Sequence, residues 1–170
     1  MSRNVRRLSF LVLMCLALAT QGLATGGSRA RLDGADLNGL INAYTADLDG
    51  QGPWHVAGPW SLDLRGGGRK ADFSASLSMI RADNPVLRQP HTHHVQLTHA
   101  KVTPITGGFS VTGAAAITGN GAVAAISGSM IVVEVTGGDA VRHANIRLTF
   151  QDGAVGHFGD QPLTGVVQLR

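Results

Sequence analysis

The sequence from Ala71 to Met79 reads Ala-Asp-Phe-Ser-Ala-Ser-Leu-Ser-Met, and it decides the fold class of this chain. Every second residue is apolar, while Asp72 and three serines stand between the apolar positions. Side chains of a β-strand point alternately to opposite faces, so this period is typical of a strand with one buried face and one face in water. The stretch therefore predicts a half-buried antiparallel strand.

The same alternation recurs along the chain from Trp54 onward. It is found in residues 60–64, 109–111, 131–135 and 146–150. Glycine clusters separate these runs, at residues 66–68, 107–108, 119–121, 137–138 and 152–153. Glycine and Asn-Gly or Asp-Gly pairs supply the positive φ angles that tight hairpins need. Residues 54–170 are therefore predicted to form a single antiparallel β-barrel or β-sandwich, a meander of about seven or eight strands.

The first 24 residues have the order of charges and apolar residues that is typical of a secretory signal. Three arginines precede an apolar run from Leu8 to Ala19, and small residues then offer cleavage sites after Ala19 or Ala24, of which Ala24 is favoured. The apolar run is shorter than the roughly 20 residues that span a bilayer. We expect residues 1–24 to be a cleaved signal peptide, and the mature protein to be secreted or periplasmic without a stable membrane anchor.

Removal of this segment changes the charge of the protein. It contains three of the 14 basic residues and none of the 11 acidic residues, so the mature chain has 11 of each. No basic run remains for nucleic acid, and we expect no nucleic-acid partner. The only cysteine, Cys15, is also removed, so the domain must fold without disulfides. The sequence leaves the oligomeric state open.

Residues 25–53 differ in composition from the rest of the chain. Gly, Ser, Asp and Asn are frequent there, which is typical of a flexible leader. Within it, Leu37, Leu40, Ile41 and Tyr44 have helical spacing, so one short amphipathic helix is compatible with the pattern. We interpret this region as a leader that packs one such segment onto the domain.

Four of the seven histidines lie within nine residues, at positions 91, 93, 94 and 99. If Val95 and Leu97 face the core, then His91 and His93 share the inward face at the start of the same strand. Alternate residues of a strand are about 6.6 Å apart, so both imidazoles can reach one ion. His99 has the same parity, but it lies about 20 Å farther along a straight strand.

A third ligand must then come from elsewhere in the chain, and His143 and His157 are the candidates. Glycines flank His157 at positions 156 and 159, which indicates a constrained loop and makes it the better candidate. Three histidines and a water suit zinc, and copper or nickel also accepts such nitrogens. The cofactor is otherwise unknown; zinc and copper are the metals that we expect.

The leading functional hypothesis is a binding protein, not an enzyme, whose histidines capture a divalent metal ion or another small molecule. An alternative is a barrel enzyme with a metal-bound water or a histidine base in an apolar internal cavity. A second alternative is a surface or partner-binding structural protein, which predicts outward histidines and an exposed apolar patch.

Overall fold

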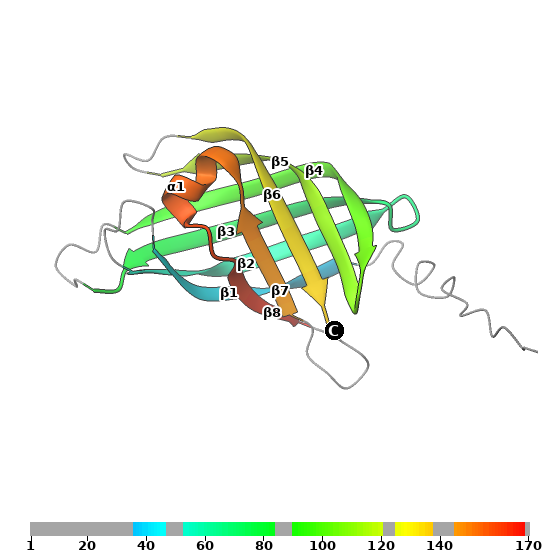
Figure 1. The fold of residues 1–170 in the computed structure, drawn as a ribbon, viewed down its shortest axis with the longest axis horizontal. Helices are drawn as coiled ribbons and strands as arrows, with labels where there is room; N and C mark the ends of the chain where they lie inside the picture. The colour runs from blue at the N-terminus through cyan, green and yellow to red at the C-terminus, as the bar shows by residue number, and fades with distance from the viewer. Residues whose placement is uncertain (1–35, 47–52, 84–89, 121–124, 138–144, 169–170) are drawn as a thin grey trace, which may run out of the picture.

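The computed structural model describes residues 36–46, 53–83, 90–120, 125–137 and 145–168, and these form a closed eight-stranded antiparallel barrel (Figure 1). The strands are β1 (Asp36–Ala46), β2 (Pro53–Arg65), β3 (Lys70–Arg81), β4 (His91–Ile105), β5 (Gly108–Gly119), β6 (Ile126–Thr136), β7 (Asn145–Phe150) and β8 (Leu163–Gln168). A short helical segment, η2 (Asp152–Ala154) and α1 (Val155–Phe158), connects β7 to β8. The all-β prediction is confirmed, and the fold is a barrel.

Each strand pairs with its neighbours in sequence, and β1 pairs with β8 to close the sheet. The pairing of β1 with β2 covers all 11 residues of β1, whereas β1 and β8 share only four pairs, from Asn38–Gln168 to Ile41–Gly165. The glycines predicted to form hairpins lie in the turns that connect neighbouring strands. Gly66, Gly67 and Gly68 have φ angles of 60°, 69° and 71° between β2 and β3, a backbone region in which only glycine is unstrained.

The barrel interior is filled with apolar side chains. In β3 the residues Ala71, Phe73, Ala75, Leu77 and Met79 are all buried, as their alternation predicts. Inward residues of the other seven strands join the same hydrophobic cluster. Full burial of a Leu, Ile or Phe side chain contributes about 1.5–3 kcal/mol each, so this core can hold the domain together.

One expectation about the leader is wrong. Residues 36–46 form β1 and belong to the barrel, and they do not form a short amphipathic helix. Ile41 and Ala43 point inward, whereas Leu40 and Tyr44 are 56% and 68% exposed. A spacing of four residues fits one face of a helix and one face of a strand alike, and an 11-residue helix has little stability of its own. The pairing of residues 36–46 with β2 therefore makes this segment a strand.

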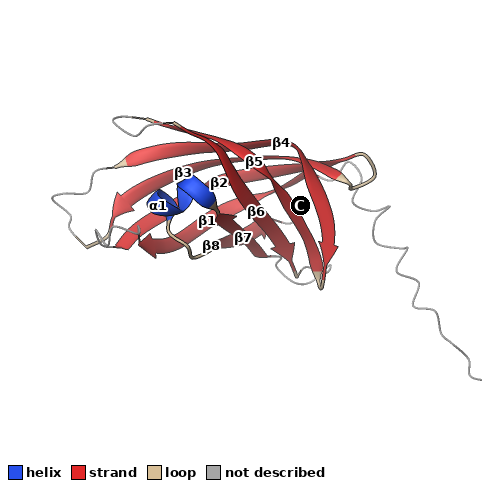
Figure 2. Ribbon diagram, turned by 45° about the horizontal axis from the view of Figure 1, so that its top comes forward, coloured by secondary structure: helices blue, strands red, loops and turns tan. Residues whose placement is uncertain are grey.

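The strands β7 and β8 have only six residues each, whereas the other six have 11–15. The segment η2–α1 follows β7 and lies across the end of the barrel at which β4 begins; Figure 2 shows this segment in front of the longer strands. The Gln151 amide donates a hydrogen bond of 2.9 Å to the Met130 carbonyl in β6. The Thr45 hydroxyl in β1 donates one of 2.6 Å to the Phe158 carbonyl. The helical segment thus bridges β6 and β1 where β7 and β8 do not reach.

A substitution at Gly159 tests this bridge. Gly159 has a φ of 79°, and an added Cβ would overlap the Ala46 carbonyl and the Thr45 hydroxyl. We expect Gly159→Ala to destabilise the protein by about 2 kcal/mol, because both the backbone strain and the overlap oppose docking of α1. The measurement is urea unfolding. Gly156→Ala is the matched control, since a Cβ there meets nothing within 4 Å. Equal stabilities of the two variants would contradict the expectation.

Candidate metal centre

Three histidines from two distant parts of the chain meet at the end of the barrel that α1 covers. Nε2 of His157 lies 2.8 Å from Nε2 of His93 and 3.1 Å from Nε2 of His91. One ligand atom from each of the three residues lies within 4.8 Å of the others, an arrangement that can hold a metal ion. The sequence separations are 64 and 66 residues, so the fold alone creates this cluster.

The strand β4 aims two of the three imidazoles. His91 and His93 occupy alternate positions and face inward, in register with Met79 and Leu77 of β3. His93 is fully buried and His91 is half-buried, whereas His94 points to solvent from the other face. The inward orientation inferred from Val95 and Leu97 is therefore what the structure shows.

The third imidazole, that of His157, is held in place by the next residue of α1, Phe158. Phe158 is fully buried and stacks on Phe150 of β7, with ring centroids 3.9 Å apart and an interplanar angle of 7°. Its carbonyl accepts the hydrogen bond from Thr45. These two contacts fix α1 and place His157 opposite β4. The glycine on each side of His157–Phe158 signalled a constrained loop, but no local pattern could reveal Thr45, which is 113 residues away.

Aromatic rings surround the cluster. Phe158 lies edge-on to His93 and to His157, with centroid distances of 4.9 and 5.1 Å. Trp54, at the start of β2, lies edge-on to His91 at 5.3 Å, and the Arg81 guanidinium is 5.9 Å from the Trp54 ring. Arg81 in turn forms a bidentate pair with Asp83, at 2.7 and 3.0 Å. The histidines thus lie among aromatic rings, and the nearby charges of Arg81 and Asp83 compensate each other.

The three Nε2 atoms cannot all hydrogen-bond to one another at once. Nε2 of a neutral histidine carries either one hydrogen or one lone pair. Nε2 of His157 lies within hydrogen-bond distance of both His91 and His93, so it can make only one full bond with this pair of neighbours. A cation at the centre would accept all three lone pairs together.

Burial and, to a smaller extent, the neighbouring His157 and His91 together lower the pKa of His93 from 6.5 to about 4. Contact with the Thr118 backbone opposes this change. That contact lacks the geometry of a hydrogen bond, because Nδ1 of His93 is buried without a hydrogen-bond partner among the described residues. His93 is thus held in its neutral form, which is the form that binds metals.

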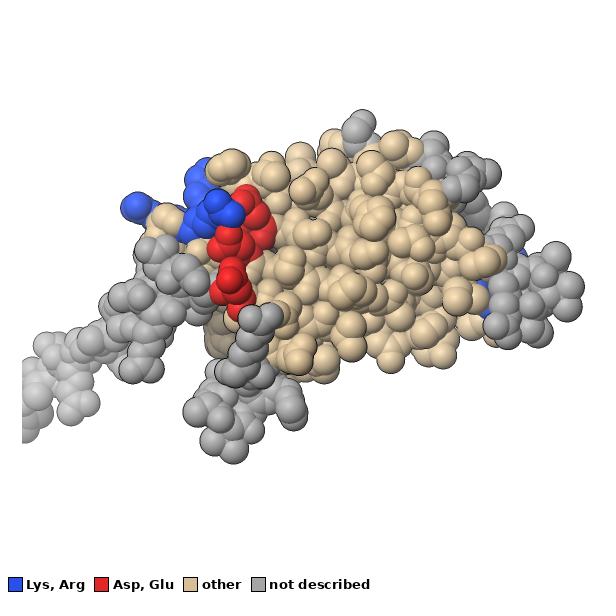
Figure 3. All heavy atoms as spheres, turned by 180° about the vertical axis from the view of Figure 1, so that it is seen from behind, with Lys and Arg blue, Asp and Glu red and all other residues tan. Residues whose placement is uncertain are grey.

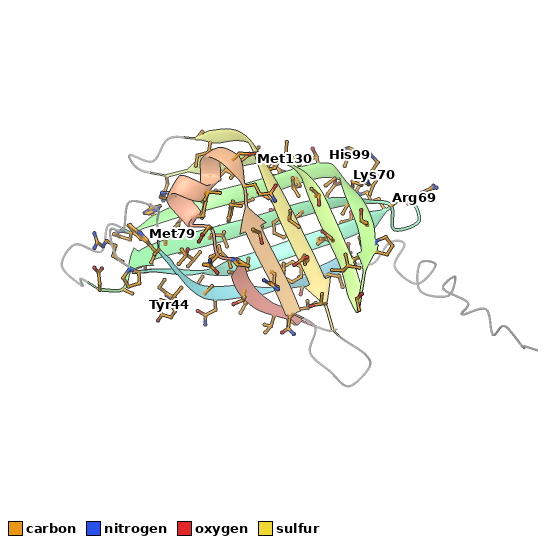
Figure 4. All side chains as sticks on the ribbon, viewed as in Figure 1. Tyr44, Arg69, Lys70, Met79, His99 and Met130 are labelled. Carbon is orange, nitrogen blue, oxygen red and sulfur yellow. The ribbon has the colours of Figure 1, made fainter. Side chains whose placement is uncertain are left out.

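The remaining histidines do not join the cluster within the described residues. His99 is exposed with a φ of 54°, because a bulge between Gln96 and Lys101 shifts the alternation of β4. Its backbone amide donates a 2.7 Å hydrogen bond to Asp72, and this bond lowers the pKa of that carboxyl. Figure 4 places His99 beside Lys70 and Arg69, at the end of the barrel away from α1. His143 lies outside the described residues.

The enzyme alternative expected from the sequence places the histidines in an apolar internal cavity. Among the described residues, the inward apolar side chains form one hydrophobic cluster. Two depressions of about 390 and 430 Å³ occur on the outer surface. The first is lined by outward residues such as Ser61, Asp63 and Ser74, and the second by residues such as Leu40 and Val166. Neither includes a histidine of the cluster.

Comparisons with known proteins found no family model, no curated protein and no solved structure that matches this chain. Within the described residues, no helix has the length and apolar character needed to cross a membrane. The functional interpretation therefore depends on the geometry of the three histidines.

The pKa of His93 predicts how acid affects the metal-free protein. Unfolded histidine binds a proton near pH 6.5, whereas folded His93 does so only near pH 4. Stability is therefore complete above about pH 6.5 and falls as the pH decreases toward 4, by about 3 kcal/mol in total. Urea unfolding of the metal-free protein between pH 7.5 and 4 measures this loss. His93→Leu should reduce the loss and the exposed His94→Gln should retain it; the same profile in all three proteins would refute the assignment.

Proposed function

We propose that this protein is an exported binding protein that captures a divalent transition-metal ion through His91, His93 and His157. The observation that carries the proposal is the convergence of three Nε2 atoms, two of them within 2.8 and 3.1 Å of the third. Nε2 of His157 can make a full hydrogen bond to only one of these two neighbouring nitrogens, whereas a metal ion can accept a lone pair from all three.

The distances suit a small tetrahedral ion. Zn–N bonds of about 2.0–2.1 Å at tetrahedral angles place neighbouring nitrogens about 3.3 Å apart. The two distances from Nε2 of His157 are shorter than this by only a few tenths of an ångström, and all three ligand atoms lie within 4.8 Å of one another. A helix of a single turn at the barrel end can make an adjustment of this size more easily than the β4 ladder, which is paired on both sides.

The donor atoms favour zinc or copper over harder cations. All three are neutral imidazole nitrogens, which suit zinc, copper and nickel. Calcium and magnesium prefer carboxylate, carbonyl and water oxygens. The cluster contains no carboxylate among the described residues. Zinc is our first choice because three histidines with one further ligand form a common tetrahedral set.

The site couples metal binding to the closure of the barrel. Two ligands belong to β4 and the third to α1, so a bound ion ties the helical segment to the sheet. A ligand that binds only the folded state stabilises it by about 2.7 kcal/mol at a free concentration of 100 times Kd. The ion would therefore strengthen the same contact that Thr45 and Phe158 make.

Export is a further part of the proposal, and its support is the composition of residues 1–24. A mature protein that begins at Thr25 and is recovered outside the cytoplasm is the expected result. N-terminal sequencing of the protein from cell fractions makes this measurement. An intact Met1 on a cytoplasmic protein would contradict it.

Metal analysis is the direct test of the function. The protein, purified without a histidine tag and exposed to zinc or copper at neutral pH, should hold one equivalent of metal. The double variant His91→Ala/His93→Ala and the single variant His157→Ala should bind at least about 100-fold more weakly, since even groups that only support a ligand contribute 10–100-fold. His94→Ala and His99→Ala are matched controls from the same strand and should bind normally. Retention of metal by the double variant would refute the site. Loss of metal binding in His143→Ala together with normal binding in His157→Ala would mean that His143, and not His157, is the third ligand.

Binding should also depend on pH with a defined sign. The ion binds neutral imidazoles, so protons compete with it as the pH falls; a histidine with the ordinary pKa takes up its proton near pH 6.5, whereas His93 does so only near pH 4. We expect the affinity to be constant above about pH 7 and to decrease steeply below about pH 6. Isothermal titration at several pH values measures this dependence, and an affinity that does not change between pH 7.5 and 5 would contradict histidine ligation.

A further inference from the structure

We infer that a metal ion in this site keeps one coordination position open, and that this position takes a water molecule or one small anion from solution. The inference rests on the proposed function, since it describes the same ion. It assigns the site a ligand class beyond the metal itself: monodentate inorganic anions such as azide or thiocyanate, and not large organic molecules.

The first support is the number of donor atoms. Zinc and cobalt(II) favour four ligands in such sites, and the described residues supply three. Asp152 and Asp160 lie closest in sequence to His157 among the described carboxylates, but both residues are exposed and neither belongs to the cluster. Asp83 is engaged by Arg81. Among the described residues no fourth protein ligand joins the cluster, which leaves one position for a molecule from solvent.

The second support is charge. Three neutral imidazoles leave the full double charge of the ion, and the immediate surroundings are the rings of Trp54, Phe150 and Phe158. An uncompensated charge in an apolar setting is unfavourable, and an anionic ligand reduces it. On the face shown in Figure 3, the acidic side chains gather at one end of the barrel together with basic ones, and a little basic surface is visible at the other end. At the first of these ends, Asp63 and Asp72 pair with Arg65, so they do not compensate a charge at the histidines.

The third support is the direction of access. His93 is fully buried, and the packed core lies behind it, so nothing can approach the ion from inside the barrel. His91 and His157 are both half-buried, so the solvent side of the cluster lies between these two residues. Trp54 packs edge-on against His91 and narrows this side. A small ligand fits such an opening better than a large one does.

Cobalt(II) makes the open position visible, because its absorption spectrum reports the ligands of a tetrahedral ion. The full mature protein is first shown to bind one equivalent of zinc and is then loaded with cobalt, or with copper(II) if cobalt is not taken up. Sodium azide and potassium thiocyanate are titrated at neutral pH and constant ionic strength. We expect a saturable spectral shift that corresponds to one anion per metal ion, and a much smaller response to benzenesulfonate at the same concentrations.

Two variants test whether the anion binds at the metal ion and on the solvent side of the cluster. His94→Gln should respond to azide as the unaltered protein does, because His94 points away from the site. Trp54→Ala should increase the response to benzenesulfonate, because the substitution widens the solvent side of the cluster. If the metal is bound but its spectrum is unchanged by either small anion, the coordination is already complete and the inference is wrong. If no metal binds, the proposed function itself fails, and the two failures are thus distinguishable.

Discussion

Closure of the sheet between β1 and β8 is the constraint on which the rest of the structure depends. Only four residue pairs join these strands, because β7 and β8 are about half as long as their neighbours. The helical segment η2–α1 completes the wall at this end through the Thr45–Phe158 hydrogen bond and the Phe150–Phe158 stack. The same segment carries His157. The same docking of η2–α1 therefore closes the wall of the barrel and brings His157 to His91 and His93.

This arrangement divides the site into a fixed part and an adjustable part. His91 and His93 are fixed by β4, which pairs with β3 and β5 on its two sides. His157 is attached to a segment with few backbone hydrogen bonds to the sheet, so its position depends on side-chain packing. A rigid pair of ligands and one adaptable ligand can adjust to the bond length of an ion without disturbing the barrel core. The filled interior favours a small ligand at the rim over a large one inside.

The alternation of apolar residues was sufficient to predict an antiparallel barrel or sandwich and the inward direction of His91 and His93, because both depend on local periodicity; the choice of a barrel depends on the pairing of β1 with β8. The flanking glycines indicated His157 for a related reason, since they mark a backbone that the fold constrains. Three features could not be predicted. Residues 36–46 form a strand because β2 pairs with them; the parity of β4 is lost at His99 because of a bulge; and Thr45 meets Phe158 only in the closed barrel. All three arise from contacts between segments that are distant in the sequence, and such contacts produce no periodic pattern of residues.

The bridge that α1 makes between β6 and β1 has a consequence for how fast an ion would leave. Release would require separation of His157 from β4, and opening of the segment from Gln151 to Gln161 would achieve this without breaking the pairing of the longer strands. Local opening of this kind needs much less free energy than global unfolding. Exchange of the ion with its surroundings would then follow the lifetime of one short segment, on a timescale independent of the unfolding rate of the barrel.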